Sequence, residues 1–404
     1  MSEPRARRLA SARFGAWGAS LLFVAIGTLP SMWIALGSNS YSSAALADGR
    51  SDPRIFRAAA ELARQGASPY SREVLAAHLG DPRALPFAYP PAALPILELH
   101  AIGSPRFGYV LSVVLFAFLQ ALAALSIGTL MLGLRSSGRQ GVDRVAIALG
   151  VGISGATFLN ATLGQTGTLL AAIALFMLAA LQTRPRLAGL LLGSLIFKPH
   201  YLLFLGLVPI FERRWEVVRF AALGAGGLIL LSLLRYEPRL WIDFIDAALQ
   251  PNPSIEAMCT WIAWPQRFGL LAPEALHRAA FAGAALGLLG LVAALWATRR
   301  LESGAGESTH ARIALALALA TLTSPNTHPY DLTLWAIPLL VLPRAAPQAW
   351  LLGGGLFIGA ALLGRERALL ALGSALLVGA ALLRLRLESA RQARDPHGAP
   401  RSAP

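Results

Sequence analysis

Residues 51–70 read SDPRIFRAAAELARQGASPY and form the centre of a long polar stretch, 37–91, between the first two hydrophobic blocks of the chain. The stretch closes on Tyr89-Pro90-Pro91, where apolar sequence resumes. Almost everything else in the chain is apolar. A carboxylate at the edge of such an apolar protein costs free energy and is usually functional, so Asp52 is the first candidate for a catalytic residue.

The composition indicates a polytopic membrane protein. The 404 residues are 55% hydrophobic and 14% charged, with a mean hydropathy of +0.57, which is more apolar sequence than a soluble core of this length needs. The single cysteine, Cys259, excludes an intramolecular disulfide. The net charge of +14 comes from arginines in short clusters between apolar blocks. These clusters are typical of topology signals, so we expect no nucleic-acid partner.

The apolar runs predict an all-α bundle of about 10–12 transmembrane helices within residues 1–387. The arginine-rich short loops predict that both termini lie in the cytoplasm. Lys198 is the only lysine among 35 basic residues, and this arginine bias indicates a bacterial protein, so we expect a bacterial cell (inner) membrane. The same topology leaves a first extracytoplasmic loop at 37–91 and a second large one at 236–273, and residues 388–404 form a disordered cytoplasmic tail. The candidate segments are 14–36, 107–134, 145–160, 166–182, 187–197, 200–211, 216–235, 274–297, 311–323, 330–343, 348–363 and 367–383.

Several of these segments are shorter than the ~20 residues needed to cross a membrane, notably those beside Lys198-Pro199 and beside residues 324–329. We therefore expect half-depth or tilted helices that meet at breaks, which are tolerated where they line a cavity. The first loop, Gly164-Gln165-Thr166-Gly167 and the loop 236–273 fall on the same side of the membrane as these breaks. The pattern predicts one cavity, open to the outside, with an extracytoplasmic site.

Two charged residues are the main candidates for this site. Asp52 precedes Pro53, so it is either the N-cap of a short helix or, with its pKa set by burial and by Arg54 nearby, a general base. Lys198 is the only lysine and lies in apolar sequence. A buried amine needs an anion. The alternatives are a structural pair with an outer carboxylate and a bound phosphate, and we favour the phosphate because no acid lies in its own segment.

The remaining polar candidates have ordinary structural explanations beside the functional ones. His328 and His200 are either hydrogen-bonding groups or substrate contacts, and Gln165 either supports a glycine packing site or contacts substrate. The histidines show no metal-ligand spacing, so we expect neither a metal nor another cofactor.

Taken in order, these motifs resemble glycosyltransferase family 87, membrane enzymes of the GT-C class that include polyprenol-phosphate-mannose-dependent mannosyltransferases. The resemblance covers roughly residues 14 to 345. Family members usually have Asp-Phe where this chain has Asp52-Pro53, and Gly-Gln-X-Asn where it has residues 164–167. The resemblance rests on the following motifs: Ser51-Asp52, Ala58-Ala59-Ala60, Gly66 with Pro69-Tyr70, Phe87-Ala88-Tyr89-Pro90-Pro91, Gly164-Gln165, Lys198-Pro199, Ser324-Pro325 with His328, and Tyr330-Asp331.

The resemblance implies a membrane glycosyltransferase that moves a hexose, with mannose the family default, from a polyprenyl-phosphate sugar to a lipid or glycan acceptor with inversion. It implies Asp52 as the catalytic base and Lys198, assisted by His328, as the stabiliser of the leaving phosphate. The expected substrate-binding residues are Lys198, His328, Gln165, Arg54, Tyr89 and His200. Two other classes stay open from the residues: a polyprenyl-linked lipid or sugar flippase or transporter, and a membrane acyltransferase.

Overall fold

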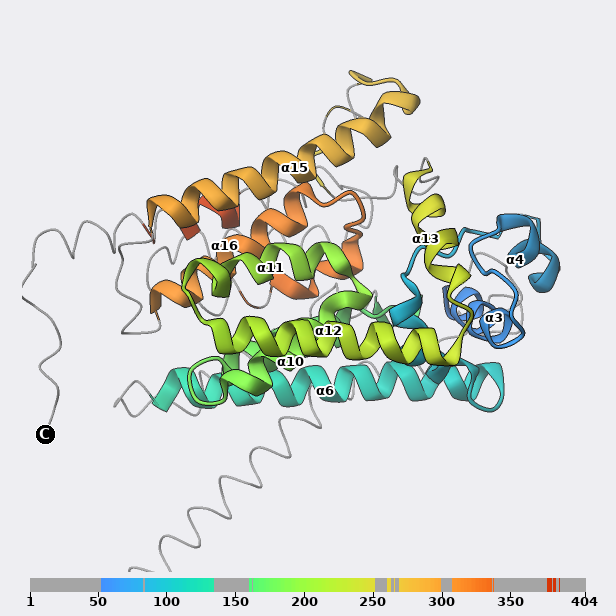
Figure 1. The fold of residues 1–404 in the computed structure, drawn as a ribbon, viewed down its shortest axis with the longest axis horizontal. Coiled ribbons are helices and arrows are strands. Elements are labelled where there is room, and N and C mark those ends of the chain that lie inside the picture. The colour runs from blue at the N-terminus through green and yellow to red at the C-terminus, as the bar shows by residue number, and fades with distance from the viewer. Residues whose placement is uncertain are drawn as a thin grey trace, which may run out of the picture.

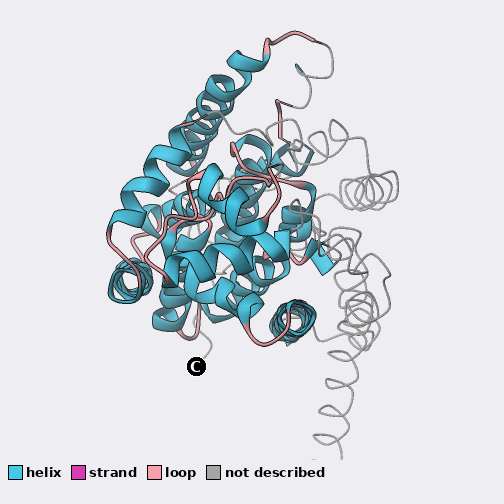
Figure 2. Ribbon diagram, turned by 90° about the vertical axis from the view of Figure 1, so that its right-hand side faces the viewer, coloured by secondary structure: helices cyan, strands magenta, loops and turns pink. Residues whose placement is uncertain are grey.

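The computed structural model describes residues 52–133 apart from Arg83, 160–161, 163–250, 260–262, 265, 269–298, 307–335, 337 and a few positions between 376 and 385. These residues form helices joined by turns and loops, and no strand occurs among them (Figure 2). The all-α prediction is confirmed. The expected segments 14–36 and 348–363, nearly all of 145–160, most of 367–383, and the tail 388–404 lie outside the described residues.

In the described part of the chain, three helices are long and apolar enough to cross a membrane: α6 (Pro105–Gly133), α12 (Trp215–Arg235) and α15 (Pro273–Ala297). At ~1.5 Å per residue they are about 30 to 45 Å long, which matches or exceeds the ~30 Å hydrocarbon core of a bilayer. They agree with the segments expected at 107–134, 216–235 and 274–297. All three follow the long axis of the molecule in Figure 1.

Three shorter helices lie between α6 and α12, and a fourth follows α15: α9 (Gly167–Ala180), α10 (Pro185–Ser194), α11 (Pro199–Phe211) and α16 (Glu307–Thr323). The break predicted at Lys198-Pro199 is present. The 3-10 turn η4 (Leu195–Phe197) follows α10, and Lys198 has non-helical angles, φ −133° and ψ 78°. Because proline disfavours helical geometry in the residue before it, the chain restarts as a new helix with Pro199 at its first position.

The second predicted break is also present. The chain leaves α16 at Thr323, passes through non-helical residues 324–328, and forms the 3-10 helix η7 (Pro329–Trp335). The segment expected at 330–343 therefore begins as a 3-10 helix. Two prolines, Pro325 and Pro329, explain the interruption because each removes a backbone donor and restricts its neighbour.

Small residues bring α10 and α12 into close contact. A Cβ added to Gly193 would lie 2.1 Å from the carbonyl oxygen of Ala221, and one added to Gly189 would lie 2.5 Å from that of Val217. Glycines four positions apart on one face let two helix backbones approach in this way, as is common in membrane bundles. A side chain at position 189 or 193 would therefore prevent the close packing of α10 on α12.

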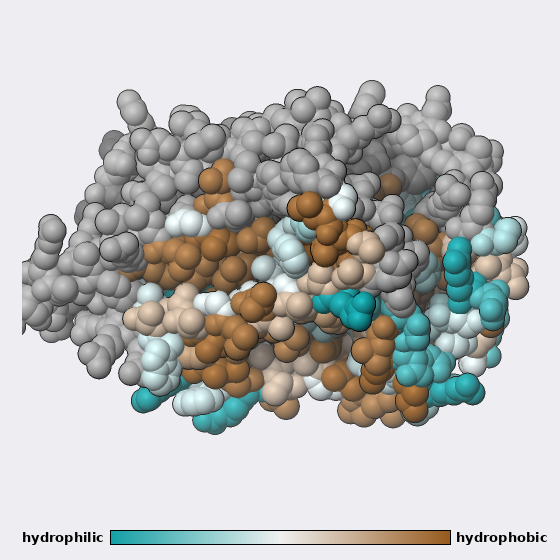
Figure 3. Space-filling model, turned by 90° about the horizontal axis from the view of Figure 1, so that it is seen from above, coloured by the Kyte–Doolittle hydropathy of each residue, from teal (hydrophilic) through white to brown (hydrophobic). Residues whose placement is uncertain are grey.

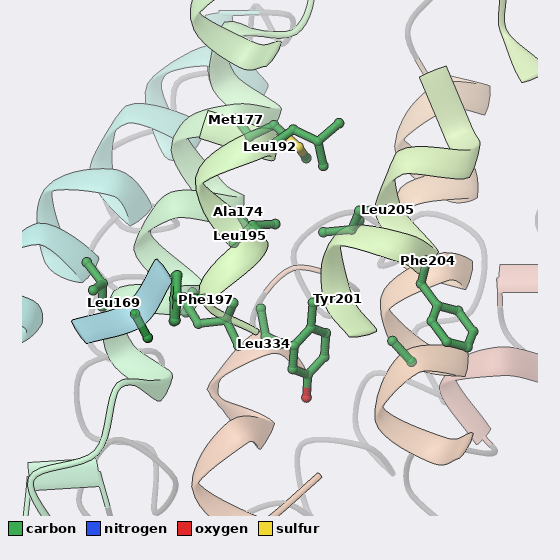
Figure 4. Packing of buried hydrophobic residues seen from close by; sticks show 14 of the residues in the cluster. Leu169, Ala174, Met177, Leu192, Leu195, Phe197, Tyr201, Phe204, Leu205 and Leu334 are labelled. Atoms are coloured by element: carbon green, nitrogen blue, oxygen red, sulfur yellow. The ribbon is translucent and has the colours of Figure 1, made fainter. Parts of the chain in front are cut away.

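The apolar core joins α9, α10, α11 and η7. Met177 from α9, Leu192 from α10, Leu205 from α11 and Leu334 from η7 are all buried in one cluster. Figure 4 shows that Tyr201 stands beside this cluster with its hydroxyl turned away from Leu205. The polar end of the ring therefore leaves the core on the side where the helices break.

The outward faces of the long helices are apolar as well. Leu223 and Leu234 on α12 are 61% and 77% exposed, and Leu286 and Leu289 on α15 are 68% and 64% exposed. In Figure 3 hydrophobic surface dominates the middle of the described face, and hydrophilic surface gathers toward the end that carries α3 and α4. Exposed leucines on long helices are stable against lipid, so these faces support the membrane assignment.

The predicted loop forms a small helical cap at one end of the bundle (Figure 1). It contains α3 (Asp52–Arg64) and α4 (Arg72–Leu79), and α13 (Arg239–Leu249) from the second loop lies beside them. The rings of Tyr70 and Phe244 pack at 5.7 Å between centroids and so join the two loops. The short elements η2 (Pro91–Ala93), α5 (Leu94–Leu97) and η3 (Glu98–Ala101) then lead into α6.

Glu98 ties this cap to the membrane helix α12. Its carboxylate accepts hydrogen bonds from Arg64 of α3 at 2.9 Å, from Arg235 at 2.7 and 2.9 Å and from Tyr236 at 2.8 Å. Burial alone would raise the pKa of Glu98, but these hydrogen bonds outweigh it and lower the pKa to about 2. One carboxylate therefore fixes three separate parts of the chain.

Glu98→Gln should lower the free energy of unfolding at pH 7 by about 1 kcal/mol, because a neutral amide accepts these bonds less strongly. A lowered pKa stabilises the fold above the usual value of 4.5, and this contribution is lost as the pH falls toward 2. The difference in the free energy of unfolding between the variant and the parent should therefore become smaller as the pH falls. Thermal unfolding in detergent at several pH values measures it, with Glu216→Gln, which loses an exposed pair with Arg186, as the control. Equal stability at pH 7 would contradict this role.

Candidate active site

Polar residues from five separate stretches meet where the helices break, below the cap. They are the first residue of α3, a tyrosine just before η2, the turn before α9, the break between η4 and α11, and the segment around η7. The cavity predicted from the sequence requires this convergence. The residues concerned are Asp52, Tyr89, Gln165, Thr166, Lys198, His200, Tyr201, His328, Tyr330 and Asp331.

Asp52 is the first residue of α3 and is half-buried. Its carboxylate is hydrogen-bonded to Gln165, and the positive charge of Lys198 acts on it. Burial raises the pKa of Asp52 to about 6, although the Gln165 bond and the Lys198 charge both lower it. At neutral pH the group is mostly ionised yet is a stronger base than an exposed aspartate.

Gln165 and Tyr89 orient this carboxylate. The Tyr89 hydroxyl donates to Oε1 of Gln165 at 3.0 Å and lies 3.1 Å from the hydroxyl of Thr166. Because an ionised carboxylate only accepts hydrogen bonds, the amide NH₂ of Gln165 is the donor to Asp52. Tyr89 is itself held by its backbone, whose carbonyl accepts from the hydroxyl of Tyr70 at 2.8 Å.

Two glycines allow the turn before α9 to come this close. Gly164 has φ +61°, and an added Cβ would lie 2.5 Å from Cγ of Pro53, so a side chain there would push the turn away from α3. At Gly167, an added Cβ would lie 2.5 Å from the carbonyl of Tyr330 and 2.6 Å from Oδ1 of Asn160. The Asn160 amide thus occupies the space that a side chain at position 167 would need.

Lys198 is 6% exposed and pairs with Asp331, which is fully buried. The second oxygen of Asp331 accepts the backbone N–H of His328 at 3.2 Å. The ammonium group also lies 5.5 Å from the ring centre of Tyr89 and 5.2 Å from that of Tyr330. Aromatic faces attract a cation, so they help to compensate for the water that Lys198 has lost.

Two histidines border the lysine. His328 is stacked on Tyr330 with 5.1 Å between ring centres, and His200 lies against Tyr201 at 4.3 Å. The charges of Lys198 and His328 both act on the His200 ring, which places the three together. The Tyr201 hydroxyl lies 3.4 Å from that of Thr327 and so joins α11 to the second break.

Six of the seven residues expected at the site thus lie in one cluster, and Arg54 does not. Its guanidinium donates to the carbonyl of Leu79 at 2.6 Å, and Arg54 lines a pocket between α3 and α4, away from the cluster. The amphipathic pattern of residues 52–64 predicts a helix, but how that helix is rotated depends on what packs against it.

Asp331 is the residue that reasoning from the sequence missed as a site member. In the sequence Asp331 was only part of the Tyr330-Asp331 motif, without a role, and it is 133 positions from Lys198. A structural pair with an outer carboxylate was one of the two explanations for Lys198, and the structure has that pair. Asn160 was missed too, although it is polar and adjoins the Gly164-Gln165 turn. It donates to the carbonyl of Tyr330 at 2.5 Å and accepts the N–H of Gly167 at 2.7 Å.

The fold and the site define a helical membrane protein in which an acid and a buried cation meet at a break in the helices. The chain belongs to glycosyltransferase family 87, whose family model matches residues 87–325. It is therefore a membrane glycosyltransferase, and the suspected resemblance is confirmed. The matched range begins after Asp52 and ends before His328 and Asp331, so their place in the site rests on geometry. A comparison with curated proteins gives no significant match.

Breaking the Lys198–Asp331 pair should destabilise the fold strongly. Asp331→Asn leaves the ammonium group buried without its counter-charge, which typically costs about 3–5 kcal/mol. Lys198→Met likewise leaves the carboxylate of Asp331 buried without its counter-charge. The double variant Lys198→Met/Asp331→Leu should be much closer to the parent, because neither charge is left alone. Thermal unfolding of the four proteins in detergent measures the coupling. A double variant that loses the full sum of both single losses would show that the two residues do not act as a pair.

Proposed function

We propose that this glycosyltransferase transfers a hexose, with mannose the expected sugar, from a polyprenyl-phosphate sugar to a lipid or glycan acceptor at the extracytoplasmic face of the membrane. The observation that supports it best is the proximity of a carboxylate with a raised pKa, Asp52, to the buried cation Lys198. A lipid-borne donor enters from the bilayer, so it needs no nucleotide-binding domain.

In the proposed step, Asp52 removes the proton of the acceptor hydroxyl, and the acceptor oxygen forms a bond to the anomeric carbon. The bond from that carbon to the donor's phosphate oxygen breaks, and its electron pair leaves with polyprenyl phosphate. A single displacement of this kind inverts the anomeric centre. Gln165, held by Tyr89, keeps the carboxylate oriented toward the acceptor.

Lys198 stabilises the leaving group in this mechanism. The donor is a phosphodiester, and its departure as a monoester adds negative charge to the phosphate, so a cation at this position favours the transition state over the ground state. An ammonium group has three N–H donors, and Asp331 accepts from one of them. His328, stacked on Tyr330 beside the lysine, assists at the same phosphate.

Asp52→Asn should lower transfer by about 10² to 10⁴-fold, with little change in the KM for the donor, because the base acts on the acceptor. The assay incubates purified protein with radiolabelled polyprenyl-phosphate mannose and a membrane lipid extract, and then identifies the labelled product. Asp243→Asn, in the outer helix α13, is the matched control and should keep full activity. Parental activity in Asp52→Asn would remove Asp52 from the role of base. Label that crosses the membrane without a new glycosidic bond would favour a flippase.

The pH dependence of transfer should report the same carboxylate. The base is active when ionised, and burial raises its pKa to about 6, so kcat/KM should rise as the pH increases through about 6 and then level off. Gln165→Leu removes a hydrogen bond that lowers this pKa, so it should shift the rise to higher pH. The measurement is the rate of transfer from pH 5 to 8 for both proteins. A flat profile in the parent would contradict the assignment.

A further inference from the structure

The exposed leucines of α12 mark where the membrane ends on the side of the cap. Leu223, Leu230 and Leu234 are all exposed, and at ~100° per residue they form one stripe that reaches the last turn of the helix. Arg235, the next residue, donates to the carboxylate of Glu98 at 2.7 Å. Lipid-facing leucines thus give way to a charged pair, so the boundary between lipid and water lies at this end of α12.

The helix α13 begins at this boundary. Residues 236–238 are all that separates it from α12, and Nε1 of Trp241 donates to the hydroxyl of Ser232 at 3.1 Å. The first turn of α13 therefore lies beside the last turn of α12. Figure 1 shows that α13 runs across the direction of α12. Since α12 is long and apolar enough to cross the membrane, α13 runs along the membrane surface.

Contacts with the cap fix which side of α13 faces inward. Leu240 is buried, and the ring of Phe244 lies 5.7 Å from the tyrosine ring that follows α3. At ~100° per residue, Ile242, Ile245 and Leu249 fall within roughly 60° of one another on the opposite side. They are 62%, 53% and 66% exposed, and they form the outer apolar face of α13.

Lipid is the occupant that this outer apolar face fits best. Three neighbouring aliphatic side chains in water would lose the stabilisation that burial gives. The face begins beside the leucine stripe of α12, so contact with lipid can continue from α12 onto α13. Asp243 and Asp246 lie on the flank next to it, and Asp243 pairs with Arg239 at 3.6 Å. An apolar face with a charged flank is typical of helices that lie in the membrane interface.

We propose that α13 is an interfacial helix whose outer apolar face is immersed in the lipid leaflet on the side of the cap. Its inner side holds the cap to that surface through Phe244 and Tyr70, and the Tyr70 hydroxyl donates to the carbonyl of Tyr89 in the candidate active site. The helix therefore sets the depth of the candidate active site relative to the lipid headgroups, whatever sugar the enzyme transfers.

The test measures the depth of fluorescent labels on the full-length protein in nanodiscs of phosphatidylcholine and phosphatidylglycerol. Cys259→Ser removes the only native cysteine, and Ile242→Cys, Ile245→Cys or Leu249→Cys is then labelled with bimane. Lipids brominated near the ester end of the acyl chain should quench all three labels more strongly than lipids brominated near the methyl end, because interfacial helices insert only ~5–10 Å. Iodide in the water should quench these labels weakly.

Two positions serve as controls. Val74→Cys, on the cap helix α4, replaces another exposed aliphatic residue, and iodide should quench its label strongly. Brominated lipid should quench the α13 labels at least about twice as strongly as the Val74 label. Leu223→Cys, near the middle of α12, should instead be quenched best by the methyl-end bromines. Thermal unfolding and gel filtration check that every labelled protein is folded.

The proposal is overturned if iodide quenches the α13 labels as strongly as the Val74 label, which would show a face open to water. It is also overturned if neither quencher reaches them, which would show that protein covers the face, or if methyl-end bromines quench them best, which would place α13 inside the hydrocarbon core. Preferential quenching by the ester-end bromines supports it. No readout uses sugar transfer, so the result is independent of the proposed function.

Discussion

The buried pair of Lys198 and Asp331 is the interaction on which the rest of the site depends. Lys198 lies at one break between helices, and Asp331 lies in the 3-10 helix η7 directly after the other, within an apolar bundle. Neither charge is stable there alone, because an isolated ion in a low-dielectric interior loses its hydration without compensation. Together they hold the two breaks at one level, and the rings of Tyr89 and Tyr330 complete the enclosure of the cation. The clustering of polar residues around the breaks therefore depends on this pair.

The sequence predicts where the helices break but not what crosses the breaks. Pro199, Pro325 and Pro329 divide the apolar sequence into runs that are too short to span a membrane. Both breaks therefore follow from local chemistry. The partner of Lys198 does not, because pairing over 133 positions depends on how the bundle packs. The available signal was the presence of the only lysine, Lys198, at one break and of an acid, Asp331, directly after the other. Because no acid lies in the lysine's own segment, the local sequence favours a phosphate as its partner.

The cap illustrates the same limit at shorter range. The spacing of apolar residues in 52–64 predicts an amphipathic helix with Asp52 at its start, and α3 has those bounds. What fixes its rotation lies elsewhere in the chain: Pro53 packs on the Gly164 turn, and Arg64 is bound by Glu98, which also binds Arg235 at the end of α12. These contacts turn Asp52 toward Gln165 and Arg54 toward α4. A sequence shows that both residues are polar and near one another, but not that they serve opposite faces of a helix.

The balance of charge around Lys198 bears on how the proposed reaction proceeds. Asp331 already compensates the lysine, so the phosphate of the proposed donor would add negative charge to a site that also holds Asp52. Additional negative charge disfavours the ionised form of a carboxylate and raises its pKa further. Donor binding therefore makes Asp52 a stronger base at the stage when the acceptor hydroxyl must lose its proton, provided that the carboxylate stays ionised at the working pH. The Gln165 hydrogen bond, which favours the ionised form, meets that requirement. The Asp331 pair gives the lysine a defined position, and in the proposed reaction the growing charge on the leaving phosphate would give it a catalytic effect, so its structural role and its proposed chemical role are compatible.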